Sequence, residues 1–266
     1  MNQAQHAITE MHAITISREY GSGGGEIAAR LARRLAWRLV DHEVITQVAQ
    51  ELEIPETEAA AYDEYVEGRI ARILNSVRPI LGSSALPTPT AYSLPSSGIG
   101  TSSSASLSSP EARVRAFYDT QRHVVLAAAN AGHVVIVGRG GQMLLADRRD
   151  VLHVRIVAPL AQCVAYVTRR EGMDEAAARA RIQMKDRARA RYMQTQFHGN
   201  HEDPHLYDQI LNTGVLDLDS AVDLICLALE RKASRLHVPT EELGPAAGMP
   251  RYAGQPADFP GRPRSS

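Results

Sequence analysis

The feature that most constrains this chain is a glycine-rich segment that follows directly after a short apolar run near the N-terminus. Residues 21–25 read Gly-Ser-Gly-Gly-Gly, between a β-branched stretch at 12–17 and a helical pattern at 25–37. Such a turn lets backbone amides converge on an anion, and the helix N-terminus adds positive potential. This order predicts a phosphate-binding loop, although a tight turn without a ligand would also use glycines.

The loop lacks the lysine that a phosphate-binding loop usually places on the β- and γ-phosphates of a nucleotide. Compared with Gly-Ser-Gly-Lys-Gly-Thr, Gly24 stands in the place of lysine and Glu26 in the place of threonine. The nearest cation is Arg18, which could grip phosphate oxygens in a bidentate manner or could be a surface charge. Glu26 could approach a magnesium ion, or its carboxylate could interact favourably with the positive N-terminal end of the helix dipole.

Composition indicates a soluble protein. The chain has 29 basic and 30 acidic residues, so its charge gives no reason to expect nucleic acid or a membrane as a partner. No apolar run approaches the roughly 20 residues that span a bilayer, and residues 1–11 lack the pattern of a signal peptide. Cys163 and Cys226 lie in apolar helical patterns, which favours buried free thiols in a reducing cytoplasm.

Apolar strands that alternate with helical patterns predict one α/β domain over residues 12–237. Strands are expected at 12–17, 39–40, 133–137, 151–157 and 207–212, and helices at 25–37, 43–52, 56–74, 111–131, 160–171, 174–197 and 218–236. The alternation implies a parallel sheet with helices on both faces. Residues 1–11 are expected to be flexible. A Ser/Pro-rich insertion at 76–110 and a tail at 238–266 are expected to be disordered.

Polar or glycine-rich residues follow three of the expected strands: the loop itself, Asp41, and Arg139 between two glycines. Ligands of parallel sheets bind beyond the carboxyl ends of the strands, so these residues mark a site. Arg139 could bind an anion or form an internal ion pair. Asp41 could bind a ribose hydroxyl, a magnesium-bound water or an acceptor hydroxyl, or it could cap the next helix.

The helical pattern at 174–197 is strongly basic and opens a candidate lid region at 174–206. Lys185 and Arg189 share one helix face, as residues four positions apart do. The helix could close over a triphosphate and stabilise charge on the transferring phosphoryl group, or it could be a solvated face. Weak nucleic-acid binding is a further reading. Metal binding is not expected of His198, His201 and His205, because their loop has no cysteine partners.

A series of motifs in matching order makes the chain resemble the cytidylate kinase-like family, relatives of bacterial cytidylate kinase among the P-loop nucleoside monophosphate kinases. The resemblance covers about residues 13–229 through Ile16–Gly24, Val40-Asp41, Val135–Gly140, Arg170-Glu171-Gly172, Asp186-x-x-Arg189-Ala190-x-Tyr192, Asp203-Pro204-x-x-Tyr207-Asp208 and Asn212-Thr213. It implies a P-loop NTPase-like three-layer α/β sandwich with a central parallel sheet and a helical lid.

The resemblance also implies an activity: transfer of the γ-phosphoryl group of ATP, with Mg²⁺, to a nucleoside monophosphate or a similar small acceptor. It implies cofactor contacts at Gly21, Ser22, Gly23, Gly24, Gly25, Glu26 and Arg170, acceptor contacts at Asp41, Arg139 and Asp186, and catalytic charge from Arg18, Arg139 and Arg189. Cytidylate kinase itself has Asp where this chain has Gly140, and many relatives have Arg at the Gly25 position. Because the loop contains no cation, a non-catalytic nucleotide-binding sensor is the alternative.

Overall fold

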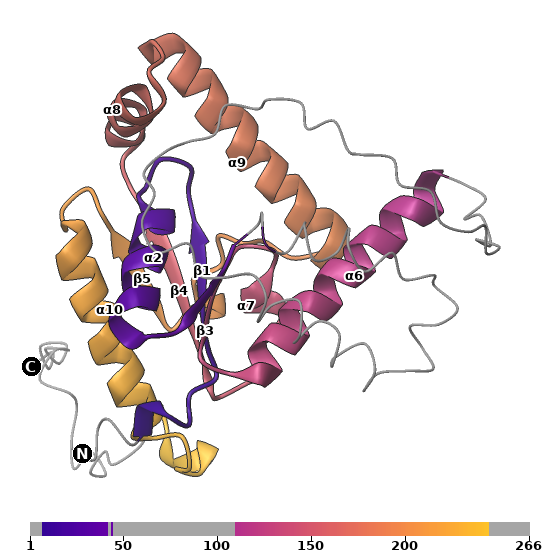
Figure 1. Cartoon of the computed structure of the whole chain (residues 1–266), viewed down its shortest axis with the longest axis vertical. Helices are drawn as coiled ribbons and strands as arrows, with labels where there is room; N and C mark the ends of the chain where they lie inside the picture. The colour runs from indigo at the N-terminus through magenta and orange to yellow at the C-terminus, as the bar shows by residue number, and fades with distance from the viewer. Residues whose placement is uncertain (1–6, 42–43, 45–109, 245–266) are drawn as a thin grey trace, which may run out of the picture.

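The structure, a computed structural model, describes residues 7–41, 44 and 110–244 (Figure 1). The helices expected at 43–52 and 56–74 and the insertion expected at 76–110 therefore lie outside the described residues, except at residues 44 and 110.

Within the described residues, the central sheet consists of five parallel strands: β1 (Ala13–Arg18), β2 (Arg38–Val40), β3 (Val134–Val137), β4 (Val151–Val157) and β5 (Gln209–Asn212). They are ordered β2-β3-β1-β4-β5, and every neighbouring pair is parallel. Strand β1 is central, and its apolar residues are buried on both faces, as in a sheet covered on two sides. This order brings the carboxyl ends of β1, β2 and β3 together at one edge.

Helices cover both faces of the sheet. On one face, α2 (Gly24–Leu35) and α10 (Leu218–Ala233) pack their apolar residues against Ile14 and Ile16 of β1. On the other face lie α6 (Pro110–Ala131) and the short α7 (Gly141–Leu144), and the apolar side of α6 packs on Ile136. The expected three-layer sandwich with a central parallel sheet is confirmed.

Helices α8 (Leu160–Glu171) and α9 (Glu175–Phe197) form a pair that extends beyond the sheet (Figure 1). Gly172, with a φ of 66°, ends α8 as expected, and the Asp174 side chain caps α9 by accepting from the Ala177 amide at 2.8 Å. The far end of α9 reaches α6, where the rings of Tyr192 and Tyr118 lie 5.6 Å apart. Helix α9 therefore spans the molecule above the sheet edge that carries the expected site.

The expected boundaries need correction in several places. Met11, assigned to the flexible N-terminus, is 1% exposed and belongs to the core. The strand expected at 207–212 begins only at Gln209, because a 3-10 helix, η1 (Pro204–Leu206), precedes it. Part of the tail expected at 238–266 is ordered: it contains η2 (Thr240–Glu242), and Arg149 donates a hydrogen bond to the Val238 carbonyl at 2.7 Å. Helix α7 was not predicted.

Replacement of Gly140 by alanine should loosen the end of α9. Gly140 (φ 69°) and Gly172 (φ 66°) share a left-handed backbone, but a Cβ at Gly140 would overlap the Phe197 ring, whereas Gly172 has open space. Both substitutions carry a backbone cost of about 1–2 kcal/mol. We expect urea denaturation to show a free energy of unfolding at least ~1 kcal/mol lower for Gly140→Ala than for Gly172→Ala. Equal losses would show that the Phe197 contact contributes nothing.

Candidate active site

The glycine loop after β1 has a backbone that only glycine adopts easily at two positions. Gly21 has a φ of 88° and packs against Cys163 and Val167 of α8, while Gly23 has a φ of 78° and packs against Leu218. Gly23 is also the N-cap of α2 and offers no side-chain acceptor to the first helical turn. The first amides of a helix have no helical partners, so this turn presents donors suited to an anion.

Side chains from the neighbouring strand ends hold the loop in place. The Ser22 hydroxyl is buried and donates to the Glu19 carbonyl at 2.9 Å, and Thr213 donates to the Ser22 carbonyl at 2.8 Å. The Glu19 carboxylate accepts from the Ala158 amide at 3.1 Å. These contacts fix the underside of the loop, so the Ser22 side chain supports the loop structurally.

Arg18 stands at the carboxyl end of β1, directly before the loop. Its guanidinium lies against Gly138, in the turn that follows β3. Burial, followed by repulsion from Arg189, lowers the pKa of Arg18 to about 10, so the side chain remains charged at neutral pH. Asp41, Arg139 and Asp186 are the other charged groups that act on it. The structure thus places Arg18 among most of the charged residues that the sequence singled out.

Arg139 occupies the turn after β3 in an unfavourable backbone conformation. Its φ is 55°, between Gly138 at 79° and Gly140 at 69°. Its Nη1 donates to Gln121 Oε1 at 3.1 Å, and its guanidinium lies 5.8 Å from the Tyr192 ring centroid. Burial lowers the pKa of Arg139. A non-glycine residue held in this region costs on the order of 1–3 kcal/mol, and such strain concentrates at functional sites.

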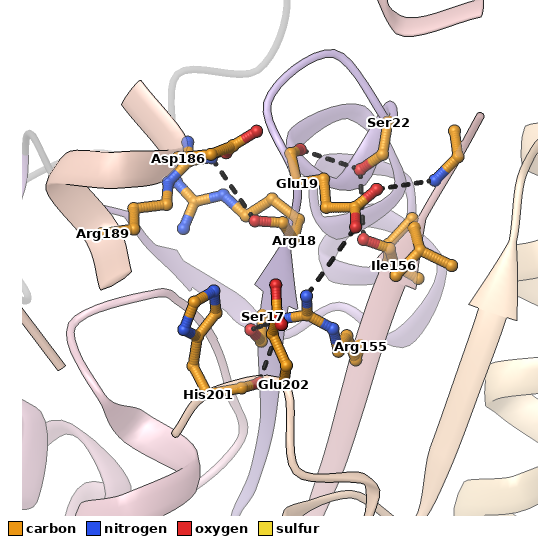
Figure 2. A network of polar contacts seen from close by, with 12 residues as sticks. Ser17, Arg18, Glu19, Ser22, Arg155, Ile156, Asp186, Arg189, His201 and Glu202 are labelled. Carbon is orange, nitrogen blue, oxygen red and sulfur yellow. Dashed lines mark hydrogen bonds and ion pairs between the residues drawn. The ribbon is translucent and has the colours of Figure 1, made fainter. Parts of the chain in front are cut away.

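Helix α9 contacts the glycine loop through Asp186 and Arg189. The Tyr20 amide donates to Asp186 Oδ1 at 2.9 Å, and Arg189 Nη1 donates to the same oxygen at 2.7 Å. Arg189 also donates to the Arg18 carbonyl at 3.4 Å (Figure 2). Its guanidinium lies over the Tyr20 ring, 5.5 Å from the ring centroid. Asp186, a residue of the expected lid region, therefore accepts a hydrogen bond from a loop amide that could otherwise bind an anion. Asp186, expected on the acceptor side, lies against the phosphate loop.

Two expected cofactor residues lie apart from this group. Glu26 forms an ion pair with Arg30 at 2.6 Å and accepts from the Tyr166 hydroxyl at 3.3 Å. Arg170 is exposed on α8 and stacks over the same tyrosine, 5.8 Å from its ring centroid. Both residues therefore belong to a cluster around Tyr166, beside α2. The Asp41 carboxylate accepts a hydrogen bond from the Val44 amide at 3.0 Å. This is the helix-capping contact that the sequence allowed as an alternative to ligand binding.

Sequence reasoning missed Arg155, a charged residue of β4 that is only 4% exposed. It donates to the His201 carbonyl at 3.1 Å and to Ser17 Oγ at 3.4 Å, and it lies 3.8 Å from Glu19 (Figure 2). Arg155 thus links the strand ends below the loop to the segment after α9. The signal was present in the sequence, because Arg155 is the one permanently charged residue in the apolar strand Val151–Val157.

The described side chains offer no site that would hold a magnesium ion by protein ligands alone. Within residues 7–41, 44 and 110–244, no group of three or more His, Cys, Asp or Glu could hold a metal ion. Glu26, in the position of the usual threonine ligand, is already paired with Arg30. In the same part of the chain, no helix has the length and apolar character to cross a membrane. Cys163 and Cys226 are buried free thiols, as predicted.

Comparison with known proteins places these features in a family context. The chain matches the cytidylate kinase-like family over residues 13–215. It is also 32% identical, over 117 residues, to the uronate isomerase of Corynebacterium glutamicum, a match that covers 44% of this chain and only 22% of that protein.

Two solved structures align over most of the chain. An uncharacterized protein from Eubacterium ventriosum has a TM-score of 0.57 at 20% identity and covers 82% of this chain and 98% of its own, a likeness of fold alone. A shikimate kinase from Bacteroides thetaiotaomicron has a TM-score of 0.40 at 14% identity over 83% of this chain and 99% of its own, which is too low to support an argument. The family match and the parallel sheet with its glycine loop together give the P-loop NTPase-like fold.

The contact between Asp186 and the loop predicts a local effect on hydrogen exchange. Asp186→Ala removes the acceptor of the Tyr20 amide, whereas Lys185→Ala alters the neighbouring exposed residue of α9. Since a hydrogen bond to a charged acceptor is worth about 1.5–3 kcal/mol, we expect exchange of this amide to accelerate on the order of tenfold or more in Asp186→Ala. NMR-detected exchange measures it. A rate equal to that of Lys185→Ala would contradict the contact.

Proposed function

The chain belongs to the cytidylate kinase-like family, and on that premise we propose that it transfers the γ-phosphoryl group of ATP to a small phosphorylated acceptor. A nucleoside monophosphate is the first candidate acceptor. One observation carries the proposal: Arg18 of β1, Arg139 of the turn after β3 and Arg189 of α9 gather beside a glycine loop at the N-terminus of α2. Arginines gathered at such a loop suit a ligand with several phosphate groups.

The arrangement supports a division of the site into two sides. On the donor side, the segment Gly21–Gly25 offers backbone amides for the ATP phosphates, and Arg189 approaches it from α9. On the acceptor side, Arg139 and Asp41 follow the neighbouring strands β3 and β2. Phosphoryl transfer needs little covalent chemistry from the protein, because positioning and neutralisation of charge provide most of the catalysis. Arginines from both sides meet this requirement.

Magnesium would reach this site on the phosphates of ATP, where it neutralises charge. Because the described side chains do not fit a protein-held ion, we assign no step to it. The buried thiols Cys163 and Cys226 suit a reducing compartment, which supports the cytoplasm as the proposed location.

A second candidate function, a nucleotide sensor without transferase activity, is favoured by a specific contact. Asp186 takes the Tyr20 amide of the loop, and the loop itself contains no cation. A protein with this arrangement could bind a nucleotide and respond through α9 without catalysing transfer. Turnover distinguishes the two functions.

A coupled assay of the purified protein with ATP, Mg²⁺ and a panel of nucleoside monophosphates tests the proposal. We expect ADP release that depends on one acceptor class, with a kcat on the order of 1 s⁻¹, at the low end for kinases. A thermal-shift series with the same ligands gives binding independently, because ligands of the native state raise the Tm. Binding of ATP without turnover for any acceptor would contradict the kinase proposal and support the sensor.

A further inference from the structure

We propose that Arg18 supplies the cation that a phosphate-binding loop normally takes from its lysine, and that Gly24 and Gly138 are the residues that position it. The inference rests on the proposed function, since it assigns the charge that phosphoryl transfer at this loop requires. It also explains why glycine stands in the lysine position. The argument has three parts: the space beside Gly24, the reach of the side chain to Gly138, and the contacts of the guanidinium.

The space that a side chain at position 24 would need is filled by Arg18. A Cβ at Gly24 would lie 2.7 Å from the Arg18 Cβ and 3.1 Å from its Cγ. These atoms are close to the backbone of β1, so they cannot move away cheaply as the end of a flexible side chain can. Gly24 itself has no left-handed φ. The packing of Arg18 therefore requires glycine at position 24. A lysine at position 24 is incompatible with the observed position of the Arg18 side chain.

Gly25 provides a direct contrast. No atom of the described residues would lie within 4 Å of a Cβ at this position, and its φ is also not left-handed. The two glycines are adjacent at the start of α2, but only Gly24 is restricted by a neighbour.

The other end of Arg18 reaches the turn after β3. A Cβ at Gly138 would overlap Arg18 Nη1, so this second glycine leaves room for the guanidinium. The side chain thus begins beside the lysine position of the loop and ends next to Arg139, on the proposed acceptor side. A cation in this position lies between the proposed donor and acceptor, where charge develops on the transferring phosphoryl group.

The guanidinium has hydrogen-bonding capacity left for a ligand. Arg18 makes no side-chain hydrogen bond or ion pair with any residue of the described ranges, although Asp41 and Asp186 attract it and Arg139 and Arg189 repel it. Arg18 is half-buried, and partial desolvation makes an unpaired guanidinium costly. Among the described residues its five donors have no side-chain partner, so they are available to an anion that binds beside it.

The chemistry assigned to Arg18 is electrostatic. During transfer, the bond between the γ-phosphorus and the bridging oxygen of ADP breaks, and its electron pair remains on that oxygen. A new bond forms between the phosphorus and an acceptor oxygen. Arg18 gives up no proton; it offsets negative charge on the phosphoryl oxygens while they pass between the two sides.

The matched pair Gly24→Ala and Gly25→Ala tests the inference. Each variant adds one methyl group at the start of α2, but only Gly24→Ala displaces Arg18. Alanine keeps the backbone amide at both positions, so any loss common to the two variants reflects the loop itself. With the acceptor found in the panel, we expect kcat to be about tenfold or more lower in Gly24→Ala than in Gly25→Ala. That difference supports the inference, and equal kcat values in the two variants would overturn it.

Arg18→Met keeps the test decisive if Gly24→Ala fails to fold, because it removes the charge and adds no bulk beside Gly24. A tenfold or greater loss of kcat at unchanged Tm supports the inference, and full retention overturns it. If wild-type protein shows no turnover, the proposed function fails separately. Calorimetric titration with ATP then decides the phosphate role of Arg18: affinity lower in Gly24→Ala and Arg18→Met than in Gly25→Ala supports that role, and equal affinities overturn it.

Discussion

The close contact between Arg18 and Gly24 is the constraint on which the rest of the site depends. Strand β1 pairs with β3 on one side and β4 on the other, so the backbone position of Arg18 is fixed from both sides. Once Arg18 occupies the space beside Gly24, the loop cannot carry its usual lysine. The positive charge of the site must then come from strand ends and from α9, where the arginines are found.

Helix α9 connects the two sides of this arrangement. In the middle of the helix, Asp186 and Arg189 contact the loop on the proposed donor side. One to two turns later, Tyr192 lies beside Arg139 on the proposed acceptor side. A single rigid element thus touches both sides, and any movement of α9 away from the loop also alters the surroundings of Arg139. Asp186, which holds α9 to the loop, accepts a hydrogen bond from the Tyr20 amide, and that amide could otherwise donate to a phosphate oxygen.

Much of the fold could be predicted from the sequence because its cause is local. Apolar runs and helical spacing located the strands and helices, and Gly172 gave the end of α8 because a left-handed residue there favours glycine. The carboxyl-edge rule placed the loop, Asp41 and Arg139 near one another. These predictions needed only periodicity and chain direction.

The contacts of the site could not be predicted because they join distant residues. The position of Asp186 depends on where α9 crosses the loop, and the contact of Glu26 with Tyr166 depends on how α8 packs beside α2. Arg155 was visible as a lone charge in an apolar strand, but its role required knowledge of the segment near His201. The space filled by Arg18 depends on one side-chain orientation, which no spacing rule specifies.

The central claim is that the charge for phosphoryl transfer comes from Arg18 because it replaces the loop lysine in space. The most direct measurement is the single-turnover rate of the exchange variant Arg18→Gly with Gly24→Lys, compared with Arg18→Gly alone. Removal of Arg18 vacates the space beside position 24, so lysine can then enter the loop. The account predicts a slow single variant and a recovery of about tenfold or more in the exchange variant. An Arg18→Gly variant as fast as wild type would contradict it.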